Sequence, residues 1–434
     1  MERNTIFALA TASGKAGLAV VRVSGAAVAD LCLRMCGSDI LPRKPSLRTI
    51  RDGLTGEVLD ECLVLRFEAG SSFTGEDVVE FHLHGSLSVV RAVEKSLSKE
   101  TSLRLAEPGE FTRRALENGR LDLTQVEGLS DLIEAETEAQ RLQALRAMDG
   151  DLSRKIERWR SKVIKALAYL ETTIDFSEED LPPQIVREVT ELIDELISEF
   201  SVEVSGSHAT EQIRNGFEVA IVGAPNVGKS TLLNRISGRD IAITSDKPGT
   251  TRDILEVRIE LSGQNIVLLD TAGQRVGQDE IEEIGIERAR SRAGSADLRV
   301  FLCENGWSEN LGVPFVEGDI VAAAKADLDK GLIGIPVSGL TGAGVDDLLR
   351  AISAVLEKRV ASASSLIRDR HRVGLSDAIK HLKSSKMLML AEVVQEDFAA
   401  EELRLCLNAL DKVIGRVDVE GLLDVVFSSF CIGK

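Results

Sequence analysis

GAPNVGKST, residues Gly223–Thr231, is the stretch that decides the fold of the middle of the chain. It follows FEVAIV (Phe217–Val222), an apolar run rich in β-branched residues, and it leads into a segment with helical spacing. A strand, a glycine-bearing turn and a helix start are the context of the GxxxxGK(S/T) phosphate loop, whose backbone N–H groups hold phosphate oxygens. We expect Lys229 to reach the β- and γ-phosphates and Ser230 to place its hydroxyl on Mg²⁺.

Three further motifs stand at the ends of apolar strand candidates. DTAG (Asp270–Gly273) begins with an aspartate that can hold the magnesium shell through water. AKAD (Ala324–Asp327) ends with an aspartate that can accept two hydrogen bonds from guanine, which adenine cannot offer. SGLTG (Ser338–Gly342) can bring a backbone N–H to the guanine oxygen. Their order predicts a guanine-nucleotide site.

Between the phosphate loop and DTAG lies SDKPGTTRD (Ser245–Asp253), which has no strong secondary-structure period. We expect a loop there, with Thr251 reaching Mg²⁺ only when the γ-phosphate is present. Such a loop would work as an order–disorder switch.

Composition limits the other classes of function. The chain has 434 residues, enough for roughly three domains, and a net charge of −18, which argues against broad charge-driven binding of nucleic acid. Its six cysteines form no metal-like CxxC pair, which favours a reducing, cytoplasmic compartment. No apolar run approaches the about 18 residues of a membrane span. His82 and His84 share a strand face and could chelate a metal, but no third ligand is near in sequence.

The patterns predict a multidomain α/β chain. Residues 1–118 are expected to be α+β, 119–213 helical, 214–358 a Ras-like doubly wound sheet, and 359–434 helical again. The two helical segments each carry an apolar stripe, so we expect them to pack together, with the α/β domain inserted between them. Residues 121–148 predict one long helix, 152–174 a second and 185–200 a third, and 205–216 a polar connector.

The chain as a whole resembles the tRNA-modification GTPase MnmE (TrmE) family. Besides the nucleotide motifs, the resemblance is carried by SFTGEDVVEFHLHG (Ser72–Gly85), EPGEFTRRALENGRLDLTQVEGLSDLI (Glu107–Ile133) and the terminal FCIGK (Phe430–Lys434). It implies a potassium-dependent GTPase that is activated when GTPase domains meet across a homodimer formed by the N-terminal domains. With the FAD-dependent partner MnmG (GidA), as a heterotetramer, it would install aminomethyl or carboxymethylaminomethyl groups at C5 of the tRNA wobble uridine. A folate, 5-formyltetrahydrofolate or methylenetetrahydrofolate, would supply the carbon.

The resemblance also implies the roles of particular residues. The GTP site would comprise Asn226, Val227, Gly228, Lys229, Ser230, Thr231, Ser245, Thr250, Thr251, Asp270, Thr271, Ala272, Gly273, Lys325, Asp327 and Ser338. Mg²⁺ would be held by Ser230 and Thr251, and K⁺ by Asn226, Ser245, Lys247 and Thr250. Glu282 would orient the attacking water, and the folate-binding N-terminal domain would use Arg22, Glu80, Arg120 and Lys434, with Cys431 beside them as a catalytic candidate.

Two positions depart from the family pattern, and other readings stay open. Ala324 stands where the guanine motif has an asparagine that ties this loop to the phosphate loop, so we expect weaker nucleotide binding. Gln274 stands where the family has an apolar residue, and it is either catalytic or a solvated loop residue. Cys431 is either a reactive thiol or packed in apolar surroundings.

Two other functions remain alternatives: a regulatory or ribosome-assembly GTPase switch, and a folate-dependent enzyme in which the GTPase is only regulatory. If tRNA binds, we expect most of the phosphate contact to come either from MnmG or from a local patch such as Arg113, Arg114 and Arg120, with weak, salt-sensitive binding to this chain alone.

Overall fold

The computed structural model describes residues 4–175, 183–239, 256–270, 290–304, 312–328, 333–361, 363–391, 395–417, 420–428, 430 and 432–433. They form two compact units. The first unit comprises Met1–Ser130, Met148–Ile156 and Asp411–Lys434, and the second comprises Asp131–Ala147 and Glu157–Leu410. The division into the four ranges 1–118, 119–213, 214–358 and 359–434 stays a prediction.

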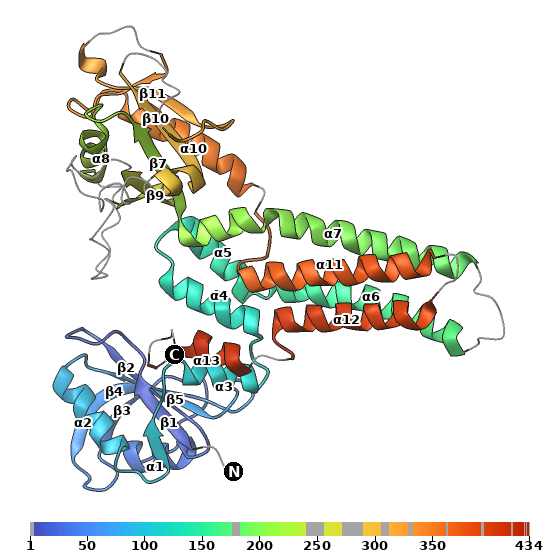
Figure 1. The fold of residues 1–434 in the computed structure, drawn as a ribbon. Coiled ribbons are helices and arrows are strands. Elements are labelled where there is room, and N and C mark those ends of the chain that lie inside the picture. Colours follow the sequence, from blue (N-terminus) through green and yellow to red (C-terminus); the bar gives the residue numbers. More distant parts are fainter. Residues whose placement is uncertain are drawn as a thin grey trace, which may run out of the picture. The chain divides into compact units, whose positions relative to one another are not determined.

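The first unit is built on a sheet of six strands in the order β3-β4-β5-β2-β1-β6. Strands β1 to β5 are labelled in Figure 1. All neighbours are antiparallel except β1 and β6, which are parallel. The strands are β1 (Thr5–Leu9), β2 (Ala19–Ser24), β3 (Ser46–Arg51), β4 (Val58–Phe67), β5 (Val78–Leu83) and β6 (Leu103–Leu105). Val79, Phe81 and Leu83 are fully buried, as expected for side chains that alternate toward one face of a strand.

The two faces of this sheet differ. Helices α1 (Val28–Cys36) and α2 (Leu87–Leu97) share one apolar core with the inward side chains of the strands. Helix α3 (Glu110–Glu117) places Phe111 in a second, smaller cluster with Ile6 and Ala8. The first unit also contains α13 (Glu420–Ser428), which packs against α3 and puts Phe427 and Phe430 in one apolar cluster.

The second unit contains another six-stranded sheet, in the order β12-β11-β10-β7-β9-β8. Only β8 runs antiparallel to its neighbour. The strands are β7 (Phe217–Gly223), β8 (Glu256–Leu261), β9 (Gln264–Asp270), β10 (Leu298–Cys303), β11 (Ile320–Ala323) and β12 (Ile335–Pro336). Every residue of β9 and β10 is buried, as expected for parallel strands covered on both faces. The predicted doubly wound sheet is therefore confirmed.

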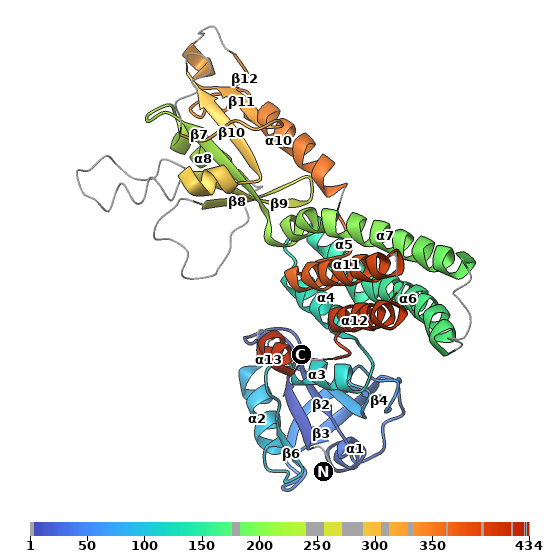
Figure 2. The same ribbon diagram turned by 45° about the vertical axis from the view of Figure 1, so that its right-hand side comes forward.

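Most helices of the second unit fall into two groups. Helices α8 (Lys229–Ser237) and α10 (Val345–Val360), with the 3₁₀ turn Ala326–Leu328, belong to the sheet just described. The long helices α6 (Asp151–Asp175), α7 (Pro183–Asn215), α11 (Asp369–Met389) and α12 (Glu396–Ile414) lie side by side as a bundle in both views (Figures 1 and 2). Because α6 and α7 precede the sheet and α11 and α12 follow it, the α/β domain is inserted in a helical domain, as predicted.

Two helix predictions were wrong, each for a local reason. Residues 121–148 form two helices, α4 (Leu123–Glu134) and α5 (Glu138–Met148). The side chain of Gln140 accepts hydrogen bonds from the N–H groups of Glu136 and Thr137, and Thr137 accepts one from Gln140 N–H, so TEAQ caps the start of α5. This capping box was readable in the sequence.

The predicted polar connector at 205–216 is instead helical up to Asn215, where α7 ends. Thr210 is buried there, and its hydroxyl donates to the carbonyls of Gly206 and Ser364. A distant segment thus satisfies the polar groups that made this stretch look like a connector. No helix within the described ranges is long and apolar enough to cross a membrane.

Candidate functional site

The phosphate loop has the expected local structure. It joins β7 to α8, with Asn226 at φ 62° and Gly228 at φ 110°. Both angles lie in the left-handed region, which glycine adopts at no cost and asparagine more readily than most residues. The turn leads directly into the first turn of α8, whose backbone N–H groups have no partner within the helix.

Lys229 is directed back over the loop that it follows. Its ammonium donates to the carbonyl oxygens of Gly223 at 2.7 Å and Ala224 at 2.8 Å, and the residue is only 4% exposed. Burial lowers the pKa of the Lys229 ammonium, against the opposite effect of the nearby Asp270 carboxylate. The geometry gives the loop one buried amine.

Ser230 and Asp270, far apart in the sequence, are brought together by the pairing of β7 with β9. The Ser230 hydroxyl donates to Asp270 Oδ2 at 2.8 Å, and Asp270 is 2% exposed. A hydroxyl beside a carboxylate is an oxygen-only pair of the kind that Mg²⁺ accepts.

The two guanine motifs lie at the ends of neighbouring strands. Lys325 has φ 56° and its ammonium pairs with Glu304 Oε2 at 2.9 Å, while Asp327 is exposed. Ser338 is 1% exposed, and its side-chain oxygen accepts the Thr341 N–H at 3.2 Å. The Ala326 N–H donates to Val337 O at 3.1 Å, so the two motifs are joined directly.

Several predicted residues lie outside the part that the structure describes: Ser245, Lys247, Thr250, Thr251, Thr271, Ala272, Gly273, Gln274, Glu282, Cys431 and Lys434. Of the remaining loop positions, Val227 is buried in the core of the sheet, and Thr231 is exposed at the first turn of α8.

In the first unit, Arg22 and Glu80 are directly opposite each other on β2 and β5. Arg22 Nε donates to Glu80 Oε1 at 2.9 Å, and their side chains are 21% and 16% exposed. The Arg22 guanidinium carbon lies 5.9 Å from the ring centre of Phe73 and 5.7 Å from that of Phe111. A guanidinium between two aromatic rings is attracted to both ring faces and presents a flat cationic surface.

The end of the chain reaches the same place. Arg22 Nη1 donates to the carbonyl of Gly433 at 3.4 Å. Gly433 has φ 101°, and a Cβ there would lie 2.2 Å from Leu9 O, so only glycine fits against β1. Arg120 donates to Gly70 O at 2.9 Å and thus lies at the base of the loop that carries Phe73. The structure therefore gathers the described members of this predicted site around one loop.

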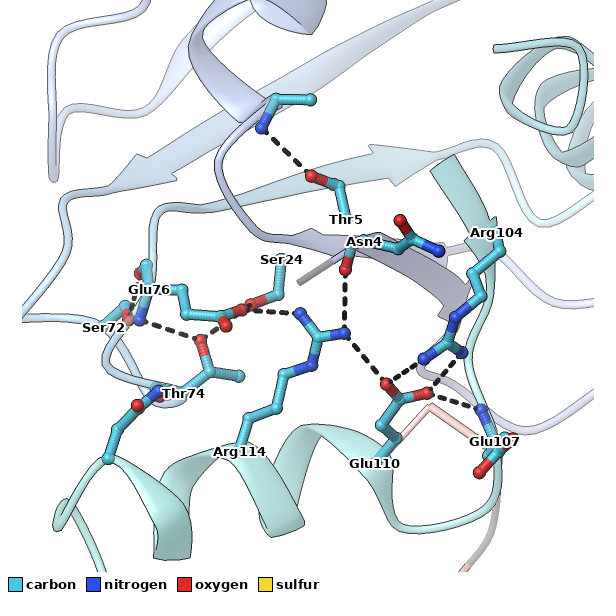
Figure 3. Close-up of polar contacts among 12 residues, drawn as sticks. Asn4, Thr5, Ser24, Ser72, Thr74, Glu76, Arg104, Glu107, Glu110 and Arg114 are labelled. Atoms are coloured by element: carbon cyan, nitrogen blue, oxygen red, sulfur yellow. Dashed lines mark hydrogen bonds and ion pairs between the residues drawn. The ribbon is translucent and has the colours of Figure 1, made fainter. Parts of the chain in front are cut away.

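Sequence reasoning missed the network that holds this site (Figure 3). Arg114, only 3% exposed, donates to Glu76 Oε2 and Glu110 Oε1, each at 2.9 Å. Glu110 also accepts from Arg104, and Glu76 accepts from the Ser24 hydroxyl at 2.9 Å. The network links α3, which carries Phe111, to β2, which carries Arg22.

This burial corrects the expected tRNA patch. Arg114 is enclosed by carboxylates and has no surface to offer a phosphate. Arg113 is paired with Asp424 at 2.6 Å and lies over the Phe427 ring. The sequence shows a row of arginines, but the turn of α3 directs one of them inward.

Glu110 has a shifted pKa because of the same contacts. Burial alone raises the pKa of its carboxyl, but hydrogen bonds from Arg104, the Glu107 N–H and Arg114 outweigh this effect, so the pKa lies below its usual range. Glu110 is therefore ionised at neutral pH.

The histidine pair does not form a metal site in the described residues. His82 Nε2 lies 3.4 Å from Glu80 Oε2, and His84 Nδ1 lies 2.8 Å from Asp60 Oδ1. No group of three or more His, Cys, Asp and Glu in the described ranges could hold a metal ion.

Comparison with known proteins covers the whole chain. The family model described as MnmE helical domain matches residues 123–431, and that described as GTP-binding protein TrmE N-terminus matches residues 5–120. Proteins named tRNA modification GTPase MnmE from Roseobacter denitrificans and Cereibacter sphaeroides are 52% and 51% identical to it, over 99% of this chain and 100% of each relative.

Among solved structures, the G domain of the T. maritima iron transporter FeoB is 26% identical over 32% of this chain and 98% of its own. Its TM-score is 0.26, so the assignment rests on the sequence comparisons. The identity of about half over the full length agrees with the phosphate loop and the Ser230–Asp270 pair that the structure shows. This chain belongs to the tRNA modification GTPase MnmE family.

Proposed function

We propose that this chain is a potassium-dependent GTPase, activated by dimerisation, that acts in the cytoplasm with the FAD-dependent MnmG. Together they install aminomethyl or carboxymethylaminomethyl groups at C5 of the tRNA wobble uridine, with a folate as one-carbon donor. The observation that carries the proposal is the presence in one chain of two separate sites. One is a phosphate loop with a buried lysine, and the other is the Arg22–Glu80 pair beside the C-terminal Gly433.

The nucleotide site would hold GTP between the phosphate loop and the two guanine motifs. Lys229 supplies a buried positive charge, and Asp327 and the Ser338 loop supply the contacts to the base. Ser230 and Thr251 would hold Mg²⁺, which when bound neutralises charge on the β- and γ-phosphates. Glu282 would orient the attacking water.

Potassium would be held by Asn226 together with Ser245, Lys247 and Thr250. Asn226 is exposed on the loop, and its amide oxygen is a ligand that a monovalent cation accepts. A cation between phosphates neutralises the charge that develops in the transition state. GTP turnover measured in potassium and in sodium tests this part, and equal rates would refute it.

The folate site would use Arg22, Glu80, Arg120 and Lys434, with Cys431 as a chemical participant. A flat heteroaromatic ligand with carboxylates matches a guanidinium flanked by Phe73 and Phe111. Equilibrium binding of 5-formyltetrahydrofolate to wild type and Arg22→Ala tests it. Arg34→Ala is the matched control, because Arg34 pairs with Glu100 on the surface of the same unit. Absence of saturable binding to wild type would favour the assembly-switch alternative.

Self-association through the N-terminal unit is supported by exposed apolar side chains at one sheet edge. Leu47 and Leu63 are direct neighbours on β3 and β4 and are 62% and 38% exposed. They point away from the face that α1 and α2 cover, so a second copy of the chain could bury them. Light scattering of Leu47→Glu/Leu63→Glu should then show a monomer where wild type is a dimer.

The whole pathway has one direct readout, the nucleosides of tRNA from cells lacking this protein. We expect the wobble uridines to lose their C5 substituent. Normal wobble uridines would remove the proposal, whatever the chain binds in vitro.

A further inference from the structure

The guanine-recognition loop, defined here as Ser338–Gly342, holds its own shape. The Ser338 N–H donates to Ala343 O at 2.9 Å, the Gly342 N–H to Ser338 O at 2.8 Å, and the Thr341 N–H to Ser338 Oγ at 3.2 Å. These bonds order the loop internally. They do not fix the distance between this loop and the phosphate loop. One bound nucleotide must contact both loops.

The loop lies directly on the helix that begins with the phosphate loop. A Cβ on Gly339 would lie 2.7 Å from Leu232 N and 2.9 Å from Thr231 C, closer than side chains tolerate. Glycine at 339 therefore allows the backbone of the guanine-recognition loop to approach the first turn of α8.

Arg235, in the last turn of α8, makes the polar tie across this contact. Its Nη2 donates to Leu340 O at 2.5 Å, and its Nε would be 3.3 Å from a Cβ on Gly342. Among the described residues this is the side-chain hydrogen bond that joins α8 to the guanine-recognition loop. Arg235 also lines an open groove of about 490 Å³ beside this contact.

Within the described ranges, the other guanine motif makes no such side-chain hydrogen bond to α8. Ala324 has only a methyl group, and its N–H donates to Cys303 O at 2.7 Å, which continues the sheet rather than reaching α8. The sheet brings both base-contacting loops to one edge, and Gly339 and Arg235 add the contacts of the guanine-recognition loop with α8.

We propose that Arg235 is a positioning residue for guanine recognition, which fixes the guanine-recognition loop on the phosphate-loop helix. This inference rests on the proposed guanine site and adds to it the residue that sets its geometry. Through Arg235, the O6 contact of the loop and the phosphate contacts of α8 are held at one separation. The charge of Arg235 acts on the loop carbonyl, not on the nucleotide.

Competition binding with GDP, 6-thio-GDP, IDP and ADP tests the role of Arg235. The sulfur analogue weakens the contact to the loop, whereas IDP lacks the 2-amino group that Asp327 is expected to read. In Arg235→Ala we expect GDP to bind about three- to tenfold more weakly, the size of one lost hydrogen bond. The preference for GDP over 6-thio-GDP should shrink, while the preference for GDP over IDP should stay.

Two further readouts separate positioning from general damage. The KM for GTP should rise with kcat at saturation unchanged, and Arg235→Lys should recover part of the affinity. Arg239→Ala is the matched control, because Arg239 lies just after the end of α8 but pairs with Asp346 at the start of α10. It should change none of these ratios.

Three results would overturn the inference. Unchanged GDP and 6-thio-GDP affinities in Arg235→Ala would show that the Arg235–Leu340 hydrogen bond does not contribute to binding. An equal loss of GDP affinity in Arg239→Ala would show a general effect on α8. A wild-type protein that binds GDP no better than ADP would remove the guanine site itself, and the Arg235 role with it.

Discussion

The nucleotide site and the Arg22 site are built on two different kinds of sheet. In the second unit, mostly parallel strands end at one edge, so Gly223, Asp270 and Ala324 come together because each ends or directly follows a strand. In the first unit, an antiparallel sheet places Arg22 and Glu80 in mid-strand, where only the register sets them opposite each other. The difference teaches that a site at strand ends can be read from motifs, while a site on a sheet face depends on pairing.

The two sites also differ in how charge is held. Lys229 is buried against backbone carbonyls, and its Coulombic partner is Asp270. The Arg22 site instead rests on alternating arginines and glutamates, Arg104, Glu110, Arg114 and Glu76. Such a network is stable only when each member keeps its partners.

The largest effect should come from breaking this network. Arg114→Met leaves Glu76 without its cationic partner, and removing one partner of a buried ion pair costs about 3–5 kcal/mol. We expect much faster hydrogen exchange in peptides from β2 and α3 of the full chain, with GDP affinity unchanged. Arg141→Met, at an exposed pair with Glu138, should change neither. Intact protection in Arg114→Met would show that the network is not what holds α3.

Lys229→Ala should separate the two sites. Loss of charge-assisted contacts to phosphate is expected to weaken GDP binding about 100-fold, whereas binding of 5-formyltetrahydrofolate should stay as in wild type. Fluorescent-nucleotide titration and folate titration on the same preparation measure both. Arg350→Ala, at an exposed pair with Asp347, is the control. A parallel loss of folate binding would contradict the independence of the two regions.

Glu110→Gln should give a smaller, pH-dependent effect. A carboxyl whose pKa is lowered by folding stabilises the protein at any pH above the pKa it has in the unfolded chain, near 4.5. This stabilisation is lost as the pH falls through the lower pKa of the folded protein. The variant should thus be less stable by about 1.5–3 kcal/mol at pH 7, the range for hydrogen bonds to charged groups. The difference in stability between wild type and the variant, measured by hydrogen exchange of α3, should become smaller below pH 4.5. A difference independent of pH would indicate a packing effect instead.

Much of the second unit could be predicted, because its motifs are short stretches whose structure depends on residues close in the sequence. The phosphate loop, the order of the guanine motifs and the doubly wound sheet follow from apolar runs that end in glycine-rich or acidic motifs. The failures came where distant partners override local pattern. Residues 205–216 look like a polar connector, yet 205–215 are helical, with the Thr210 hydroxyl donating to the distant Ser364 carbonyl.

The first unit was less readable. Its resemblance motifs named Arg22, Glu80 and Arg120, but nothing in EFTRRALENG tells which arginine is buried. That depends on which side of α3 faces the sheet, where Glu76 accepts from Arg114 and from Ser24 of β2. Without those partners, three neighbouring arginines read as a surface patch.

The sequence by itself determined the family, the phosphate loop and the inserted α/β domain, because a loop of fixed spacing and a repeating apolar pattern act over a few residues. Only the tertiary structure decided that Arg22 faces Glu80 beside Gly433, that Arg114 is buried, and that Arg235 holds the guanine-recognition loop. Each of these contacts joins residues that the chain brings together only through strand register or helix packing. Their free energy therefore depends on partners that no local pattern specifies.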